Sequence, residues 1–190
     1  MPKVRKSIET LEDIGEKELL NRLKKYTDIG QIDDDTAVIN SRSKKLIINT
    51  DVIVEGVHFS EKTLSPQETG WKAVAINLSD LASSGVEEII GITVGLIAPP
   101  STPWSWVEET YSGIDSALKR FGGKLLGGDC SRGIEKILSI TAIGTQGPLN
   151  LHRSNALPGD YLLTSGIHGL SRLGLELLLS DFEIHHLIDG

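Results

Sequence analysis

Stretches of apolar residues alternate with polar ones along the chain, and their spacing predicts strands and helices in turn. Two β-branched runs, at 37–39 and 45–48, are close enough in the sequence to pair as an antiparallel hairpin. Aspartates precede the first run, and Asn49, Thr50 and Asp51 follow the second. The hairpin would bring these two acidic ends together. Because neighbouring carboxylates repel one another unless a cation lies between them, this is the first indication of a metal site.

The most regular helical pattern runs from Gln67 to Ser83, and Gly85 is positioned to end it. Its apolar residues at helical spacing predict a core-facing side: Trp71, Val74, Ala75, Leu78, Leu81 and Ala82. A different stripe is formed by Ala73, Asn77, Asp80 and Ser84. Since aspartate is a poor helix former in mid-helix, Asp80 is expected to serve some other purpose. A hydrogen bond to a neighbouring loop is the alternative.

The other segments predict further helices and strands. The helices are 7–26, 101–121 and 170–179, and the strands are 88–97, 124–126, 137–144 and 160–165. The strand at 124–126 is expected to lead into a tight glycine-rich turn at 127–133. The strand at 137–144 is apolar on both faces, which predicts a central place in its sheet. Strands and helices alternate, so the fold class is α+β or α/β, with a boundary near Gly147–Gly159.

Composition narrows the classes of function. The chain has 190 residues, of which 39% are hydrophobic, and its net charge is −7. The negative charge, without any run rich in Lys or Arg, argues against nucleic-acid binding. The single cysteine, Cys130, excludes an intramolecular disulfide and a Cys-rich zinc site. No signal-peptide pattern and no apolar run of ~20 residues is present, so we expect no membrane span and a cytoplasmic location.

Five aspartates are predicted at the ends of elements or beside a glycine turn: Asp34, Asp35, Asp51, Asp80 and Asp129. Carboxylates that converge at one edge of a sheet can hold Mg²⁺, which in turn binds substrate phosphates. Taken singly, each aspartate is more commonly a turn former or a helix cap. Gly127, Gly128 and Asp129 would allow backbone amides to approach a phosphate, with a structural turn as the alternative. No P-loop or GxGxxG motif is present.

Segments in a defined order carry a resemblance to a known family. They are Asp34–Val38 (DDTAV), Asn49–Phe59 (NTDVIVEGVHF), Gly70–Ala82 (GWKAVAINLSDLA), Tyr111–Gly113, Gly127–Gly133 (GGDCSRG) and Arg153–Asp160 (RSNALPGD). In order and spacing the chain resembles the thiamine-monophosphate kinase family, within the superfamily of aminoimidazole ribonucleotide synthetase. The segments span nearly the whole chain, and the second and third are specific to the kinase within that superfamily.

The resemblance implies ATP-dependent phosphorylation of thiamine monophosphate to thiamine diphosphate, by direct in-line transfer assisted by Mg²⁺. By position, the implied Mg²⁺ ligands are Asp34, Asp35, Asn49, Thr50, Asp51, Asp80 and Asp129. The implied ATP contacts are Tyr111, Gly128, Asp129 and Arg153, and His58 would contact the thiamine phosphate. No catalytic residue is assigned, because the transfer needs no covalent intermediate. The implied fold is an α+β domain with a mixed or antiparallel sheet and helices on one face, which forms a homodimer.

Two departures from the family pattern bear on activity. Asp33 stands where the family has the first glycine of Gly-Asp-Asp, which adds charge and tolerates fewer backbone conformations. Family members also carry a complete second domain, whereas we expect an ATP/Mg-binding domain at 1–148 and the start of a truncated second α/β domain at 149–190. Weak or no kinase activity is then expected. The alternatives are a non-catalytic nucleotide-binding and dimerisation module, or a sister enzyme acting on another phosphate-activated substrate.

Overall fold

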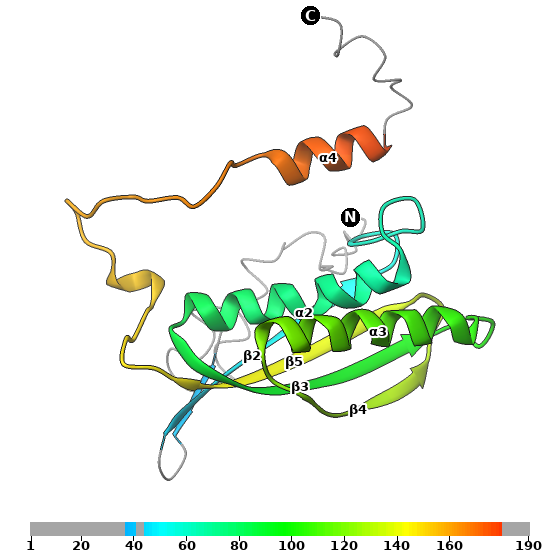
Figure 1. Cartoon of the computed structure of the whole chain (residues 1–190), viewed down its shortest axis with the longest axis horizontal. Helices are drawn as coiled ribbons and strands as arrows, with labels where there is room; N and C mark the ends of the chain where they lie inside the picture. Colours follow the sequence, from blue (N-terminus) through cyan, green and yellow to red (C-terminus); the bar gives the residue numbers. More distant parts are fainter. Residues whose placement is uncertain (1–36, 41–43, 180–190) are drawn as a thin grey trace, which may run out of the picture.

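The computed structural model describes residues 37–40 and 44–179, which form one curved sheet with two long helices over it, followed by an extended segment (Figure 1). The strands are β1 (Ala37–Asn40), β2 (Lys45–Val54), β3 (Val86–Ala98), β4 (Leu125–Arg132) and β5 (Ile137–Gln146). The helices are α2 (Pro66–Ser83), α3 (Trp104–Phe121), α4 (Leu170–Leu179) and the short 3₁₀ helix η2 (Arg153–Asn155). The helix predicted at 7–26, together with Asp33, Asp34 and Asp35, lies outside the described residues.

The strands are ordered β1-β2-β5-β3-β4 across the sheet. Neighbouring strands are antiparallel except β3 and β4, which are parallel and are connected through α3. A parallel pair needs such a long crossover, because the chain has to return to the end at which the first strand began. The mixed sheet confirms the expected α+β class and the hairpin of β1 with β2. It also confirms the central place of β5.

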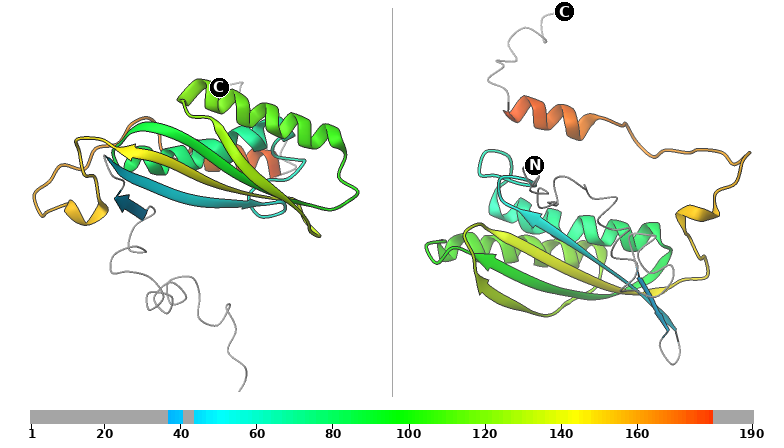
Figure 2. Two further views of the ribbon diagram at one scale, coloured as in Figure 1. Left: turned by 90° about the horizontal axis from the view of Figure 1, so that it is seen from below. Right: turned by 180° about the vertical axis from the view of Figure 1, so that it is seen from behind.

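Both α2 and α3 cover the same face of the sheet, as Figure 2 shows, and the core lies between them and the strands. Alternate residues of β2, β3 and β5 point to this face, and Ile47, Ile53 and Ile140 are almost fully buried there. Val52 points the other way and is 45% exposed. Among the described elements, none covers that second face, which we call the open face.

Helix α2 begins with a capping box. Ser65 accepts a hydrogen bond from the backbone N–H of Glu68 at 3.3 Å, and the Glu68 carboxylate accepts one from the Ser65 N–H at 2.8 Å. The sequence-based division of α2 into faces is partly wrong. Trp71 is 37% exposed, whereas Asn77 from the other stripe is 1% exposed. The stripe that carries Asn77 faces the sheet, because its polar side chains find partners there.

Two local predictions after residue 120 are also wrong. The segment 127–133 is not a turn, because β4 continues without interruption from Leu125 to Arg132 and pairs with β3. A Cβ at Gly128 would lie 2.0 Å from the Val94 carbonyl oxygen, so the missing side chain is what allows the two strands to approach. Residues 160–165 form no strand. They lie on the exposed segment between η2 and α4, where no neighbouring strand is available to pair with them.

Helix α4 confirms the predicted helix at 170–179, and its leucines are largely exposed. Among the described helices, none is both long enough and apolar enough to cross a membrane.

Candidate metal and phosphate site

Four polar residues meet where α2 crosses β2, and we call them the β2–α2 cluster: Asn49, Asp51, Asn77 and Asp80. The Nδ2 group of Asn49 donates to Oδ1 of Asn77 at 3.2 Å and to Oδ2 of Asp80 at 3.3 Å. The backbone N–H of Asp51 donates to the same Asn77 oxygen at 3.1 Å. The carboxylate of Asp80 on α2 and the backbone of Asp51 on β2 are therefore connected through two amide side chains.

The cluster has the donor chemistry of a site for a hard cation. The Oδ1 atom of Asn49 is buried and has no hydrogen-bond partner among the described residues. A buried carbonyl oxygen without a partner is costly, and Mg²⁺ takes oxygen ligands of this kind together with carboxylates. The described residues contain no group of three or more His, Cys, Asp or Glu side chains that could hold a metal. Asn49, Asp51 and Asp80 thus fit part of a ligand set.

The structure corrects the predicted position of residues 49–51 in their strand. It also places Thr50 and Asp129 away from the β2–α2 cluster. Asn49, Thr50 and Asp51 lie in the middle of β2 rather than at its end. The hydroxyl of Thr50 points to the open face, where it is 2.7 Å from the hydroxyl of Thr141 on β5. Asp129 lies on β4, which β5 and β3 separate from β2, a distance of about 14 Å at ~4.8 Å per strand. One copy of the chain does not bring Asp129 to the β2–α2 cluster.

His58 lies in the loop that follows β2. Its Nδ1 atom accepts the backbone N–H of Val54 at 3.1 Å, which places the proton of a neutral ring on Nε2. The Lys72 ammonium of α2 donates to the His58 carbonyl oxygen at 2.6 Å. His58 and Lys72 line a hollow of about 830 Å³ between this loop and α4, to which α4 contributes Arg172. Three cationic or protonatable groups therefore border one space.

The same loop is held at its start by Lys136. Its ammonium donates to Glu55 at 2.7 Å, lies 3.5 Å from Glu61 and is 5.3 Å from the centre of the Trp106 ring. The Lys136 side chain is only 11% exposed. Burial acts to lower the pKa of Lys136, but the hydrogen bond and charge of Glu55, with those of Glu61, outweigh burial and raise it.

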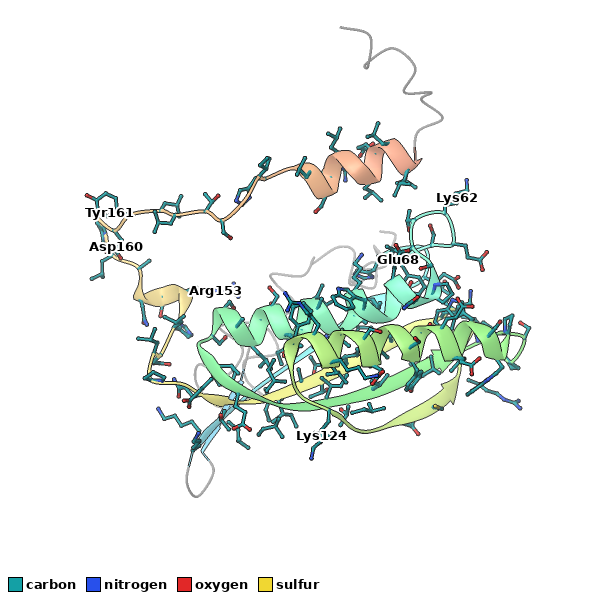
Figure 3. The ribbon with its side chains drawn as sticks, in the orientation of Figure 1. Lys62, Glu68, Lys124, Arg153, Asp160 and Tyr161 are labelled. Carbon is teal, nitrogen blue, oxygen red and sulfur yellow. The ribbon has the colours of Figure 1, made fainter. Side chains whose placement is uncertain are left out.

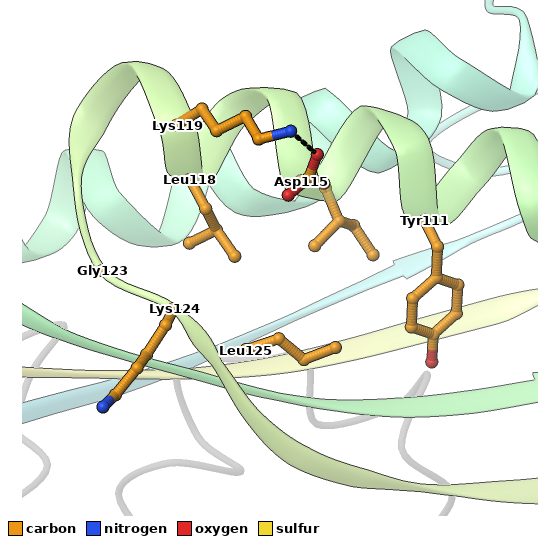
Figure 4. Close-up of a pocket in the computed structure, with 8 residues that line it drawn as sticks. Tyr111, Asp115, Leu118, Lys119, Gly123, Lys124 and Leu125 are labelled. Atoms are coloured by element: carbon orange, nitrogen blue, oxygen red, sulfur yellow. Dashed lines mark ion pairs between the residues drawn. The ribbon is translucent and has the colours of Figure 1, made fainter.

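The residues predicted to contact ATP come from three separate elements. Tyr111 of α3 extends toward the sheet and lines a hollow of about 300 Å³ beside residues 123–125 (Figure 4). Burial, followed by the nearby Cys130, raises the pKa of Tyr111. Gly128 and Asp129 lie on β4, and the Asp129 carboxylate accepts the Ser131 hydroxyl at 3.1 Å. Arg153 lies in η2, on the segment beyond β5 (Figure 3).

Two structurally central residues were not assigned from the sequence. Asn77 was placed on the stripe of Asp80 but was given no role, although asparagine is as poor a helix former as aspartate. Its low helix propensity therefore marks Asn77 in the same way as Asp80. Lys136 gave no signal, because a lysine next to Glu135 is typical of an exposed charged turn.

Comparison with known proteins gives the family. The sequence model of the family described as "AIR synthase related protein, N-terminal domain" matches residues 33–146, which is more than half of the chain. The chain belongs to this family. It is 73% identical over 173 residues to the thiamine-monophosphate kinase of Prochlorococcus marinus. The matched region covers 91% of this chain and 52% of that protein. It is 41% identical to the corresponding protein of Synechococcus elongatus, over 92% of this chain and 54% of the relative.

Solved structures agree with this assignment. A structure described as AaThiL complexed with AMPPCP and TMP superposes with a TM-score of 0.69 at 32% identity, covering 74% of this chain and 45% of that one. Thiamine monophosphate kinase from Aquifex aeolicus gives a TM-score of 0.64 at 30% identity, over 73% and 44%. The resemblance expected from the sequence segments is thereby confirmed. The chain spans about half the length of the curated relatives it matches.

Proposed function

We propose that this chain is the nucleotide-binding part of an enzyme that uses ATP and Mg²⁺ to phosphorylate thiamine monophosphate to thiamine diphosphate. The observation that carries the proposal is the 73% identity to the Prochlorococcus marinus kinase, over 91% of the chain. A match over 173 of the 190 residues necessarily extends across residues 49–80, which carry the β2–α2 cluster. The ATP analogue and TMP named for the AaThiL structure indicate the same two kinds of ligand.

We assign the phosphate-bound metal to Asn49, Asp51 and Asp80. When bound, Mg²⁺ neutralises phosphate charge and aligns the phosphates for in-line transfer. The chain itself supplies two carboxylates and the partnerless oxygen of Asn49 on a rigid strand and helix. Asp34, Asp35, Thr50 and Asp129 stay predictions as ligands, and so do Tyr111, Gly128 and Arg153 as ATP contacts.

We assign the acceptor phosphate to the hollow at His58. The Nε2 side of the ring and the Lys72 and Arg172 side chains suit a phosphate monoester, because each can donate a hydrogen bond to a phosphate oxygen. Lys72 and Asp80 are eight residues apart on α2, which is about 12 Å along a helix axis. One helix therefore spans from the metal ligand to the acceptor hollow.

The open face supports the expected homodimer. It exposes Val52 and carries apolar residues of the neighbouring strands, such as Ile143 of β5. Apolar surface of this kind is commonly covered by a second subunit. Analytical ultracentrifugation should give twice the mass of one chain, and Val52→Asp should shift the protein to monomer. A wild-type chain that sediments as a monomer at micromolar concentration would contradict this assignment.

The proposed activity is tested by incubating the chain with ATP, Mg²⁺ and thiamine monophosphate and separating thiamine diphosphate by chromatography. Product that requires both Mg²⁺ and ATP supports the kinase. The second candidate function is a nucleotide-binding and dimerisation module, favoured by the half-length coverage of the relatives. Calorimetric binding of Mg²⁺ with a non-hydrolysable ATP analogue, without turnover, supports that module. The absence of both nucleotide binding and product would exclude both functions for this chain.

A further inference from the structure

Asn77 is the residue at which the hydrogen bonds of the β2–α2 cluster converge. It is 1% exposed, and its Oδ1 atom accepts from both Asn49 and the backbone of Asp51. Its Nδ2 group donates to the carbonyl oxygen of Ala73, one turn earlier in α2, at 2.8 Å. The side chain therefore connects helix to strand in the only orientation that these partners allow. Ala73 offers an acceptor and Asp51 a donor, so a flipped amide would lose both bonds.

The orientation of Asn77 in turn fixes that of Asn49. The Nδ2 group of Asn49 faces two acceptor oxygens, those of Asn77 and Asp80. Because Nδ2 is held by these two acceptors, the position of the carbonyl oxygen is fixed as well, and this is the buried atom that has no partner among the described residues. The amide of Asn77 thus decides where an oxygen of Asn49 points and holds the backbone that carries Asp51.

We propose that Asn77 is a positioning residue of the metal site, acting through Asn49 and Asp51 without binding the ion itself. This inference rests on the proposed function, since it assumes that the β2–α2 cluster holds a divalent cation. A ligand held by a second hydrogen-bonding residue loses less entropy when it binds, and removal of such a residue typically weakens metal affinity 10- to 100-fold.

Thr110 shows the difference between a side chain that positions other residues and one that only forms a hydrogen bond within its own helix. Thr110 is fully buried on α3, and its hydroxyl donates only to the Trp106 carbonyl of its own helix, at 2.7 Å. Its side-chain hydrogen bond therefore reaches no residue of the β2–α2 cluster. Asn77 makes an equivalent bond to its own helix but also serves two donors on β2. Thr110→Val is accordingly the matched control, because it also removes a buried polar group.

The experiment measures Mn²⁺ binding by electron paramagnetic resonance, with a non-hydrolysable ATP analogue present, for the wild-type chain, Asn77→Ala and Thr110→Val. Unfolding by urea is recorded for each. We expect Asn77→Ala to weaken Mn²⁺ affinity at least tenfold and Thr110→Val to leave it within twofold. Because Asn77 acts through Asn49, adding Asn77→Ala to Asn49→Ala should cost less than it does in the wild-type chain. Asn77→Ser, which keeps an acceptor, should fall between the wild type and Asn77→Ala, and it replaces Asn77→Ala if that variant does not fold.

Two results overturn the inference. One is an unchanged Mn²⁺ affinity in Asn77→Ala and Asn77→Ser. The other is an equal loss of affinity in Asn77→Ala and Thr110→Val, which would show that lost stability alone is responsible. A wild-type chain that binds no Mn²⁺ with the ATP analogue overturns the proposed metal site itself. That outcome is distinct, because it is read from the wild type before any variant is compared.

Discussion

Gly70 of α2 and Gly113 of α3 each lie against the backbone of the other helix. A Cβ added at Gly70 would be 1.9 Å from the Thr110 carbonyl oxygen, and one added at Gly113 would be 1.9 Å from that of Gln67. The two helices therefore cross in direct backbone contact. This contact sets how closely α3 packs on α2, the helix that carries the proposed metal ligand.

Alanine at either crossing position is expected to destabilise the fold by about 3 kcal/mol, the upper part of the range for overpacking, because backbone atoms have to move. Helix propensity alone predicts the opposite sign, a gain of about 1 kcal/mol for alanine over glycine. Gly174→Ala in α4 is the control, since nothing lies within 4 Å of its added Cβ. Urea unfolding of the three variants shows which of these two signs the change in stability has. A gain in stability for Gly70→Ala and Gly113→Ala would contradict the crossing geometry.

Breaking the pair of Lys136 and Glu55 is expected to destabilise the loop that carries His58. Lys136→Met removes a charge-assisted hydrogen bond and leaves the Glu55 carboxylate half-buried, at a cost of about 1–3 kcal/mol. Glu55→Gln with Lys136→Met should recover part of that loss, since no charge is then left unpaired. The denaturation midpoint is measured for both, with Lys44→Met, at an exposed ion pair, as the control. Equal midpoints for Lys136→Met and Lys44→Met would contradict the role of Lys136.

The raised pKa of Lys136 also predicts a pH dependence. A lysine whose folded pKa lies above its unfolded value, about 10.4, stabilises the fold fully below that pH. The stabilisation is lost as pH rises through the folded pKa. Urea midpoints should therefore fall more steeply above about pH 10.4 for the wild type than for Lys136→Met. Parallel profiles would show that the ion pair adds nothing.

The capping box of α2 predicts a loss of stability in acid. The backbone N–H and the hydroxyl of Ser65 lower the pKa of Glu68 below its ordinary value of 4.5. The contribution of Glu68 is thus present above that pH and is lost as pH falls through the lowered pKa. Glu68→Gln should flatten the dependence of the thermal midpoint between pH 3 and 5. Glu109→Gln, at an exposed position of α3, should leave it unchanged.

Asp80→Asn is expected to abolish metal-dependent nucleotide binding. The substitution keeps the size of the side chain but removes the charge that a divalent cation requires. Calorimetry with a non-hydrolysable ATP analogue, with and without Mg²⁺, measures the effect. Glu109→Gln, at an exposed position of α3, is the control. Unchanged Mg²⁺-dependent affinity in Asp80→Asn would remove Asp80 from the site.

Local patterns predicted most elements, because strands and helices of this length are specified by nearby residues. The helix at 67–83 and the strand at 137–144 were found within two residues of their predicted ends. The turn predicted at 127–133 failed, since glycines that suggest a turn also permit close approach of strands. Gly128 has that second purpose beside Val94.

In the candidate site, too, the sequence indicates the chemistry of single residues, whereas tertiary packing decides which residues meet. The types of residue in Asn49–Asp51 and the helical Asp80 point to cation chemistry from the sequence alone, because oxygen ligands and helix propensity are properties of single residues. Only the packing of α2 on β2 shows that Asn77 connects them, and that two intervening strands keep Asp129 away. Which side chains meet depends on strand order and helix crossing, and these arise from contacts between residues far apart in the chain.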